Sequence, residues 1–217
     1  MRAPTRRGGL AGARPWGRHA TELATGVALV AISWLVLTDA TTERVPSWEV
    51  DLFGAVNDLP DWLRWPIWPV MQLGNFWMAA VSGLAVYALT RRWRPALATT
   101  TAVLLAWVGA KVVKGVIDRG RPADLLEGVH VREAGLHGHG YVSGHTAIAF
   151  AVATVVTPLL PGRWRLVPFA VACLVGFARI YYGAHLPLDV VGGAGIGILS
   201  GLVASLAFGT IDPVHDR

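Results

Sequence analysis

Long apolar runs dominate this chain and set the main constraint on its fold. Six stretches approach the roughly 20 apolar residues that an α-helix needs to cross a bilayer. We place them at residues 21–38, 66–90, 96–117, 144–160, 166–182 and 187–208. Only 15% of the residues are charged, against roughly 25% in a typical soluble domain. The sequence therefore predicts an all-α, polytopic membrane protein whose six transmembrane helices form one bundle over residues 19–210.

The positive charges predict how this bundle is oriented. The formal net charge is +5, and arginines gather before the first run, at 91–94 and at 163–165. Basic loops remain in the cytoplasm, so both chain ends are expected there. No aromatic-basic groove or base-reading motif accompanies these charges, which argues against nucleic-acid binding. The segments expected to face outward are 39–65, 118–143 and 183–186.

The two ends of the chain are expected to be cytoplasmic tails. Residues 1–18 are basic and rich in Gly, Ala and Pro, a composition typical of disorder, and residues 211–217 form the short C-terminal tail. A cleaved signal peptide is the alternative interpretation of the first run, because basic residues precede it. No small-x-small cleavage site follows in residues 37–42, so we favour a retained anchor.

The outward segment 39–65 has helical periodicity. Its apolar positions are Trp48, Leu52, Phe53, Val56, Leu59 and Leu63, and its polar positions are Glu49, Asp51, Asn57 and Asp58. This pattern predicts an amphipathic helix lying at the membrane surface. Trp62, Trp65 and Trp68 follow it, as in an interfacial aromatic belt. This helix could either anchor the loop or form a lip through which lipids enter, and we favour the anchor.

The last apolar run carries small residues at every fourth position. They are Gly193, Gly197, Gly201, Ser205 and Gly209. Such a stripe lets a second helix approach closely. We expect it to pack inside the bundle, and a homodimer face is the alternative.

Three clusters of ionisable residues interrupt the apolar sequence, each at the expected outward end of a run. They are Lys114 with Arg121-Pro122, then Ser143-Gly144-His145, then Arg179 with His185 and Asp189. Ionisable groups in or beside membrane spans are costly and usually functional. This set suits a phosphate ester, because cations bind its oxygens, one imidazole can attack phosphorus and another can protonate the leaving oxygen.

The third cluster is the most informative by spacing. His185 and Asp189 are four residues apart, so they share one face at the start of a helix, and Pro187 is typical of a first helical turn. A carboxylate on one imidazole nitrogen leaves the other nitrogen as a nucleophile. Arg179 can hold two phosphate oxygens. A purely structural hydrogen bond is the alternative for the His–Asp pair.

The other two clusters supply an anion site. Ser143 is a natural N-cap, and Gly144 lets an anion approach the helix N-terminus beside His145. Lys114 adds a cation, although pairing with Asp118 is the structural alternative. Two further cations are expected to be peripheral: Lys111 would snorkel outward, and Arg119 would be merely interfacial.

Together, Lys114-x6-Arg121-Pro122, Ser143-Gly144-His145 and Arg179-x5-His185-x3-Asp189 resemble the three-part signature of the type 2 phosphatidic acid phosphatase (PAP2) superfamily. Their order, their spacing and the six-span layout are similar, so the resemblance covers nearly the whole chain. Two positions depart from the usual pattern. Val142 stands where proline is common, which should alter loop stiffness only. Ala178 stands where serine is common, which should remove a hydroxyl contact to phosphate.

The resemblance implies roles for these residues. His185 forms a phosphohistidine, Asp189 orients it, and His145 protonates the leaving oxygen and then helps to activate water. The phosphoryl oxygens are held by Lys114, Arg121, Ser143, Gly144 and Arg179. No metal or other cofactor is implied, because the cations do the charge work of a metal. We therefore interpret His137-Gly138-His139 as a solvated loop rather than a metal site.

The resemblance also implies a lipid phosphate substrate at the outer face of the plasma membrane. Undecaprenyl diphosphate is our first choice, and phosphatidylglycerol phosphate and phosphatidic acid are alternatives. Two other classes of protein remain open: a small transporter whose charges line an ion path, and an inactive lipid-binding protein on the same fold. Phosphate release from a panel of lipid phosphates separates the enzyme from both.

Overall fold

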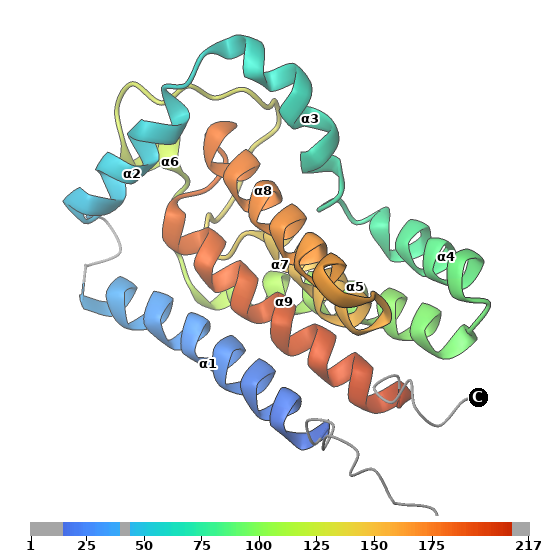
Figure 1. Cartoon of the computed structure of the whole chain (residues 1–217). Coiled ribbons are helices and arrows are strands. Elements are labelled where there is room, and N and C mark those ends of the chain that lie inside the picture. The colour runs from blue at the N-terminus through green and yellow to red at the C-terminus, as the bar shows by residue number, and fades with distance from the viewer. Residues whose placement is uncertain (1–14, 40–43, 210–217) are drawn as a thin grey trace, which may run out of the picture.

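The computed structural model describes residues 15–39 and 44–209, which form helices and contain no strand (Figure 1). The all-α prediction is confirmed for this part of the chain. The α-helices are α1 (Pro15–Asp39), α2 (Ser47–Asn57), α3 (Arg64–Gln72), α4 (Met78–Thr90), α5 (Trp93–Val116), α6 (Pro122–Leu125), α7 (Gly144–Val156), α8 (Val167–Tyr181) and α9 (Pro187–Phe208). Short 3₁₀ turns are η1 (Asp61–Leu63), η2 (Thr157–Leu159) and η3 (Gly162–Leu166).

Helix α9 is the centre of the bundle, and it packs against α1, α5 and α7 (Figure 1). Its small residues make this packing close. A Cβ added at Gly193, Gly197 or Gly201 would overlap atoms of Ser143, Ala147 or Thr154 respectively, near or along α7. The interpretation of the stripe as core packing is confirmed for these three glycines.

Several helices are suited to a bilayer. Among the residues that the structure describes, three helical segments are long and apolar enough to cross it, namely α5, Gly162–Tyr181 and α9, and two more are apolar but shorter, α4 and Gly144–Leu159. Large apolar side chains cover the outside of the bundle, including Trp77 and Leu89, which are 75% and 86% exposed. So much exposed apolar surface needs a lipid environment. The protein is a membrane protein, and the count of six spans stays a prediction.

The prediction of one helix over residues 66–90 is wrong. Helix α3 ends at Gln72 and α4 begins at Met78. Gly74 lies in the break, where a Cβ would come within 2.6 Å of the His145 carbonyl oxygen. Glycine and asparagine also have low helix propensity, so the Gly74-Asn75 pair favours a break that brings the chain against the start of α7.

Segment 39–65 contains a helix, but its faces are not those expected. In α2 the polar side chains of Glu49 and Asn57 are buried with Phe53, whereas Trp48 and Leu52 are each 47% exposed. Glu49 is buried because Arg119 lies beside it. The Asn57 amide donates to the Tyr181 carbonyl at 3.1 Å. Placement of α2 at the membrane surface stays a prediction.

The chain ends are partly defined. Helix α1 already begins at Pro15, so residues 15–18 are helical rather than disordered, and an Arg18–Glu22 ion pair of 2.7 Å stabilises this first part. The predicted tails at 1–14 and 211–217 lie outside the described residues. Figure 1 shows the start of α1, the α4–α5 link and the end of α9 at one end of the bundle, with α2 and the α8–α9 link at the other.

Candidate active site

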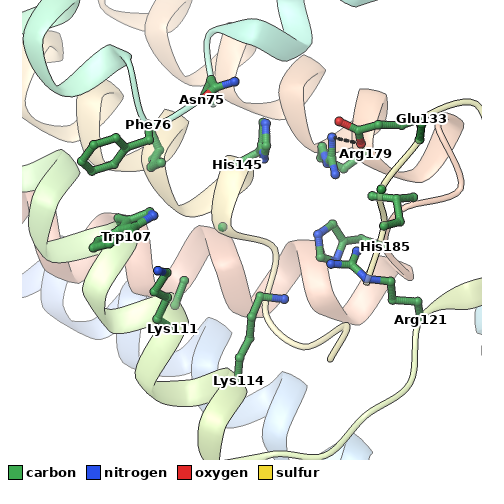
Figure 2. Close-up of a pocket in the computed structure, with 17 residues that line it drawn as sticks. Asn75, Phe76, Trp107, Lys111, Lys114, Arg121, Glu133, His145, Arg179 and His185 are labelled. Atoms are coloured by element: carbon green, nitrogen blue, oxygen red, sulfur yellow. Dashed lines mark ion pairs between the residues drawn. The ribbon is translucent and has the colours of Figure 1, made fainter. Parts of the chain in front are cut away.

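The three sequence clusters meet at one cavity of about 380 Å³. Helix α5, Arg121 just before α6, the start of α7, the end of α8 and the α8–α9 link each supply part of it, and Figure 2 shows their side chains pointing toward one another. Of the predicted site residues, those that line the cavity are Lys114, Arg121, Gly144, His145, Arg179 and His185. Ser143 and Asp189 lie behind its wall and are fully buried.

His185 sits in a tight link that joins α8 to α9. Gly183 has a φ of +69°, and a Cβ there would come within 2.7 Å of the His130 carbonyl oxygen, so this turn requires glycine. The link places His185 Nδ1 3.4 Å from Asp189 Oδ2. Asp189 Oδ2 also accepts the Leu186 N–H at 2.9 Å. The carboxylate is therefore fixed at the start of α9, with the imidazole between it and the cavity.

The protonation state of His185 suits a nucleophile. Only 3% of the residue is exposed. Burial lowers the pKa of His185 from 6.5 to about 3, and Asp189 offsets only part of this effect. The imidazole is thus neutral near pH 7, so the ring nitrogen turned away from Asp189 has a free lone pair.

Ser143 caps α7 as predicted. Its Oγ accepts the Thr146 N–H at 3.4 Å and the Thr146 hydroxyl at 3.0 Å. The hydroxyl is thus engaged within the helix start, and Gly144 and His145 are the residues of this motif that line the cavity. A contact between the Ser143 hydroxyl and phosphate stays a prediction.

Lys114 is held by the loop that precedes α7. Its Nζ donates to the carbonyls of His139 and Gly140 at 2.8 and 2.9 Å. An ammonium has three donors, so one remains for a phosphate oxygen. The alternative prediction, that Lys114 pairs with Asp118, is wrong, because Asp118 pairs with His139 at 2.7 Å instead.

The two arginines of the site are also engaged. Arg121 donates to the carbonyls of Gly138 at 3.1 Å and Ala184 at 3.0 Å, so it ties the loop to the link that carries His185. Arg179 is 3% exposed and pairs with Glu133 at 2.7 Å (Figure 2). A carboxylate therefore occupies the guanidinium that would otherwise receive phosphate oxygens.

Behind the cavity lies a buried network of ion pairs that the sequence does not predict. Arg119 Nη1 lies 2.8 Å from Asp189 Oδ1, and Nη2 lies 2.6 Å from Glu49 Oε2. Glu49 Oε1 also accepts the Leu188 N–H at 2.9 Å. All of these side chains are almost fully buried, so the prediction of an interfacial Arg119 is wrong. No local pattern indicates the network, because 70 residues separate Arg119 from each partner.

Other predicted features have no direct part in the cavity. Within residues 15–39 and 44–209, no three His, Cys, Asp or Glu side chains are grouped to hold a metal ion. Val142 and Ala178, the two departures from the family pattern, are buried. Ala178 packs in an apolar cluster with Met71, Tyr181 and Tyr182 rather than lining the cavity.

A helical membrane protein with a His–Asp pair, a second histidine and four cations around one cavity has the groups that a phosphoryl-transfer enzyme needs. Residues 92–212 match the PAP2 superfamily, and the chain therefore belongs to this family. It is accordingly a phosphatase, a hydrolase that acts on phosphoric esters.

Individual proteins are similar to this chain at low identity. The bacitracin transport permease protein BcrC of Bacillus licheniformis is 29% identical over 157 residues, 70% of this chain and 77% of that protein. An undecaprenyl-diphosphatase of Sulfolobus acidocaldarius is 26% identical over 117 residues, 54% of this chain and 56% of that enzyme. The crystal structure of Aquifex aeolicus LpxE has a TM-score of 0.68 and 29% identity, covering 75% of this chain and 96% of that one.

Proposed function

We propose that this protein hydrolyses a lipid phosphate or lipid diphosphate through a phosphohistidine on His185. The observation that carries the proposal is the position of His185, between the fixed carboxylate of Asp189 and a cavity lined by cations. Undecaprenyl diphosphate, converted to undecaprenyl phosphate, is the preferred substrate. The related undecaprenyl-diphosphatase supports this preference. Phosphatidylglycerol phosphate and phosphatidic acid are the alternative substrates.

The chemistry follows from the residues that line the cavity. The neutral His185 nitrogen attacks phosphorus, and the P–O bond to the leaving group breaks. In its protonated form His145 gives a proton to the leaving oxygen, and the neutral imidazole then takes a proton from the water that cleaves the P–N bond. Lys114, Arg121 and Arg179, with the Gly144 amide, offset the charge on the phosphoryl oxygens. Preorganised donors of this kind contribute roughly 3 kcal/mol each to transition-state stabilisation.

Asp189 acts through His185 rather than on the substrate. As the imidazole becomes covalently bonded to phosphorus it gains positive charge, which the carboxylate 3.4 Å away stabilises. The cations supply the charge that a metal would otherwise provide, so we propose a metal-independent reaction.

The site is proposed to face the outside of the plasma membrane. The arginine-rich α4–α5 link lies at the opposite end of the bundle from the α8–α9 link (Figure 1), and basic loops remain in the cytoplasm. Both chain ends would then be cytoplasmic, in a multi-pass protein. The lipid head group would enter from the outer leaflet.

Phosphate release by the purified, reconstituted protein tests the proposal. A panel of undecaprenyl diphosphate, phosphatidylglycerol phosphate and phosphatidic acid is assayed with and without excess EDTA, with His185→Gln as the inactive control. We expect release from at least one lipid, unaffected by EDTA. Loss of activity on chelation would contradict the metal-independent reaction, and activity in His185→Gln would remove His185 as the nucleophile.

Transport is the second candidate function, because one related protein, from Bacillus licheniformis, is a bacitracin transport permease protein. An ion path needs ionisable groups along its length, whereas the described cations of this site gather at one end of the bundle. Solute flux into proteoliposomes by a His185→Gln variant without phosphatase activity would favour transport.

A further inference from the structure

One cation of the cavity has no part in the mechanism above. Lys111 lines the cavity with Lys114, and Figure 2 shows both side chains pointing into it from α5. Three residues along an α-helix correspond to a rise of about 4.5 Å, so the two lysines lie on one face of α5 about one turn apart. Lys111 lies on the side nearer the middle of α5, away from His185.

The charge of Lys111 has no acidic partner among the described residues. Its Nζ instead lies 3.9 Å from the centroid of the Trp107 ring. A lysine inside an apolar helix is costly unless it is paired or functional. The cation–π contact fixes the ammonium beside the cavity and leaves its N–H donors available to an anion.

The position of Lys111 matches the leaving side of the reaction. In a displacement by His185, the leaving oxygen lies on the far side of phosphorus, where His145 would protonate it. Figure 2 shows His145 between the Arg179–His185 side of the cavity and the side lined by Phe76, Trp107 and Lys111. Phe76 and Trp107 pack ring to ring, with centroids 4.9 Å apart, and form an apolar edge along which a lipid chain can leave.

We propose that Lys111 binds the second, lipid-linked phosphate of a diphosphate substrate, which makes this site selective for lipid diphosphates over monophosphates. The inference rests on the proposed phosphatase function. His185 bonds to the terminal phosphorus, and the bond from that phosphorus to the bridging oxygen breaks. The electron pair goes to the bridging oxygen, which Lys111 stabilises and His145 protonates. Water then cleaves the P–N bond, so the products are inorganic phosphate and the lipid monophosphate.

The test compares two lipids that differ only in the second phosphate. Initial rates are measured for farnesyl diphosphate and farnesyl monophosphate in detergent micelles, with the full chain and its Lys111→Met variant. Lys111→Arg retains the charge. Val112→Met is the matched control, because it places the same side chain at the next position of α5, which is exposed and outside this cavity.

We expect Lys111→Met to lower kcat/KM for the diphosphate about 10- to 100-fold, the usual effect of losing a charged hydrogen bond, and for the monophosphate less than about threefold. Lys111→Arg should retain most of the diphosphate activity, and Val112→Met should match the unaltered protein with both lipids. Equal losses with both lipids, or no loss with either, would overturn the inference.

The unaltered protein separates this inference from the proposed function. Hydrolysis of the monophosphate but not the diphosphate would refute the role of Lys111 and leave the phosphatase intact. Hydrolysis of neither lipid, nor of any in the panel, would refute the proposed function and this inference with it.

Discussion

Arg119 joins two carboxylates in the interior, and its removal should affect stability more than the loss of either contact suggests. Arg119→Met leaves Glu49 and Asp189 buried without their cation. Removing one partner of a buried ion pair costs about 3–5 kcal/mol. In a protein of this size each kcal/mol lowers Tm by roughly 2–4 °C, so we expect a fall of roughly 6–20 °C.

The companion variants make this prediction specific. Glu49→Gln keeps the size of the side chain and an oxygen for the Leu188 N–H, and leaves Arg119 paired with Asp189. It should therefore lower Tm less than Arg119→Met does. The double variant should be more stable than Arg119→Met alone, because the neutral glutamine side chain no longer needs a cation. Such non-additivity is the signature of residues in one network.

Unfolding of the detergent-solubilised protein can be followed by the fluorescence of its ten tryptophans, with phosphate release measured alongside. Arg119→Met should also lower kcat with little change in KM, since Asp189 orients His185 but does not touch the substrate. A Tm within about 2 °C of the unaltered protein in Arg119→Met, or additive losses in the double variant, would refute this account of the network.

Two further predictions concern the loop and the pH dependence. Glu133→Gln removes the carboxylate that pairs with Arg179 and should lower KM about fivefold, because a partly exposed ion pair contributes up to about 1 kcal/mol. The control is Glu127→Gln, which changes an exposed residue of the same loop. An unchanged KM in Glu133→Gln would contradict competition between Glu133 and the substrate phosphate for Arg179. His185 has a pKa of about 3 in the folded protein against 6.5 ordinarily, so below pH 6.5 the unfolded chain binds the extra proton and stability falls from pH 6.5 toward 3. The contribution of His185 to this slope should reach at most about 1.4 kcal/mol per pH unit and should be lost in His185→Gln; the same pH dependence of stability in both proteins would contradict the buried neutral imidazole.

The parts of the fold that follow local rules could be predicted from the sequence. Apolar runs of the right length located α5, α8 and α9 to within a few residues, and Pro187 marked the start of α9. The split of residues 66–90 could not be predicted in the same way. It depends on the contact of Gly74 with the His145 backbone, and no short stretch of sequence contains both residues.

In the site, too, local features can be predicted from the sequence and contacts between distant residues cannot. The spacing of His185 and Asp189, and the Ser143 cap of α7, are local and were predicted correctly in geometry. The periodicity of segment 39–65 predicts a helix at the membrane surface with Glu49 on its polar face, because an isolated helix gives no sign that Arg119 lies opposite Glu49. Glu133 likewise carries no motif, and only the folded loop brings it to Arg179.

The central claim is that His185 is the nucleophile, and the most direct test is to trap and locate the covalent intermediate. The protein is mixed with farnesyl diphosphate labelled with ³²P in the terminal phosphate, quenched within milliseconds in base, and analysed by peptide mass spectrometry. The account predicts a base-stable phosphohistidine at His185 that is absent from His185→Gln. Phosphate release without any labelled protein, or label on His145 instead, would contradict it.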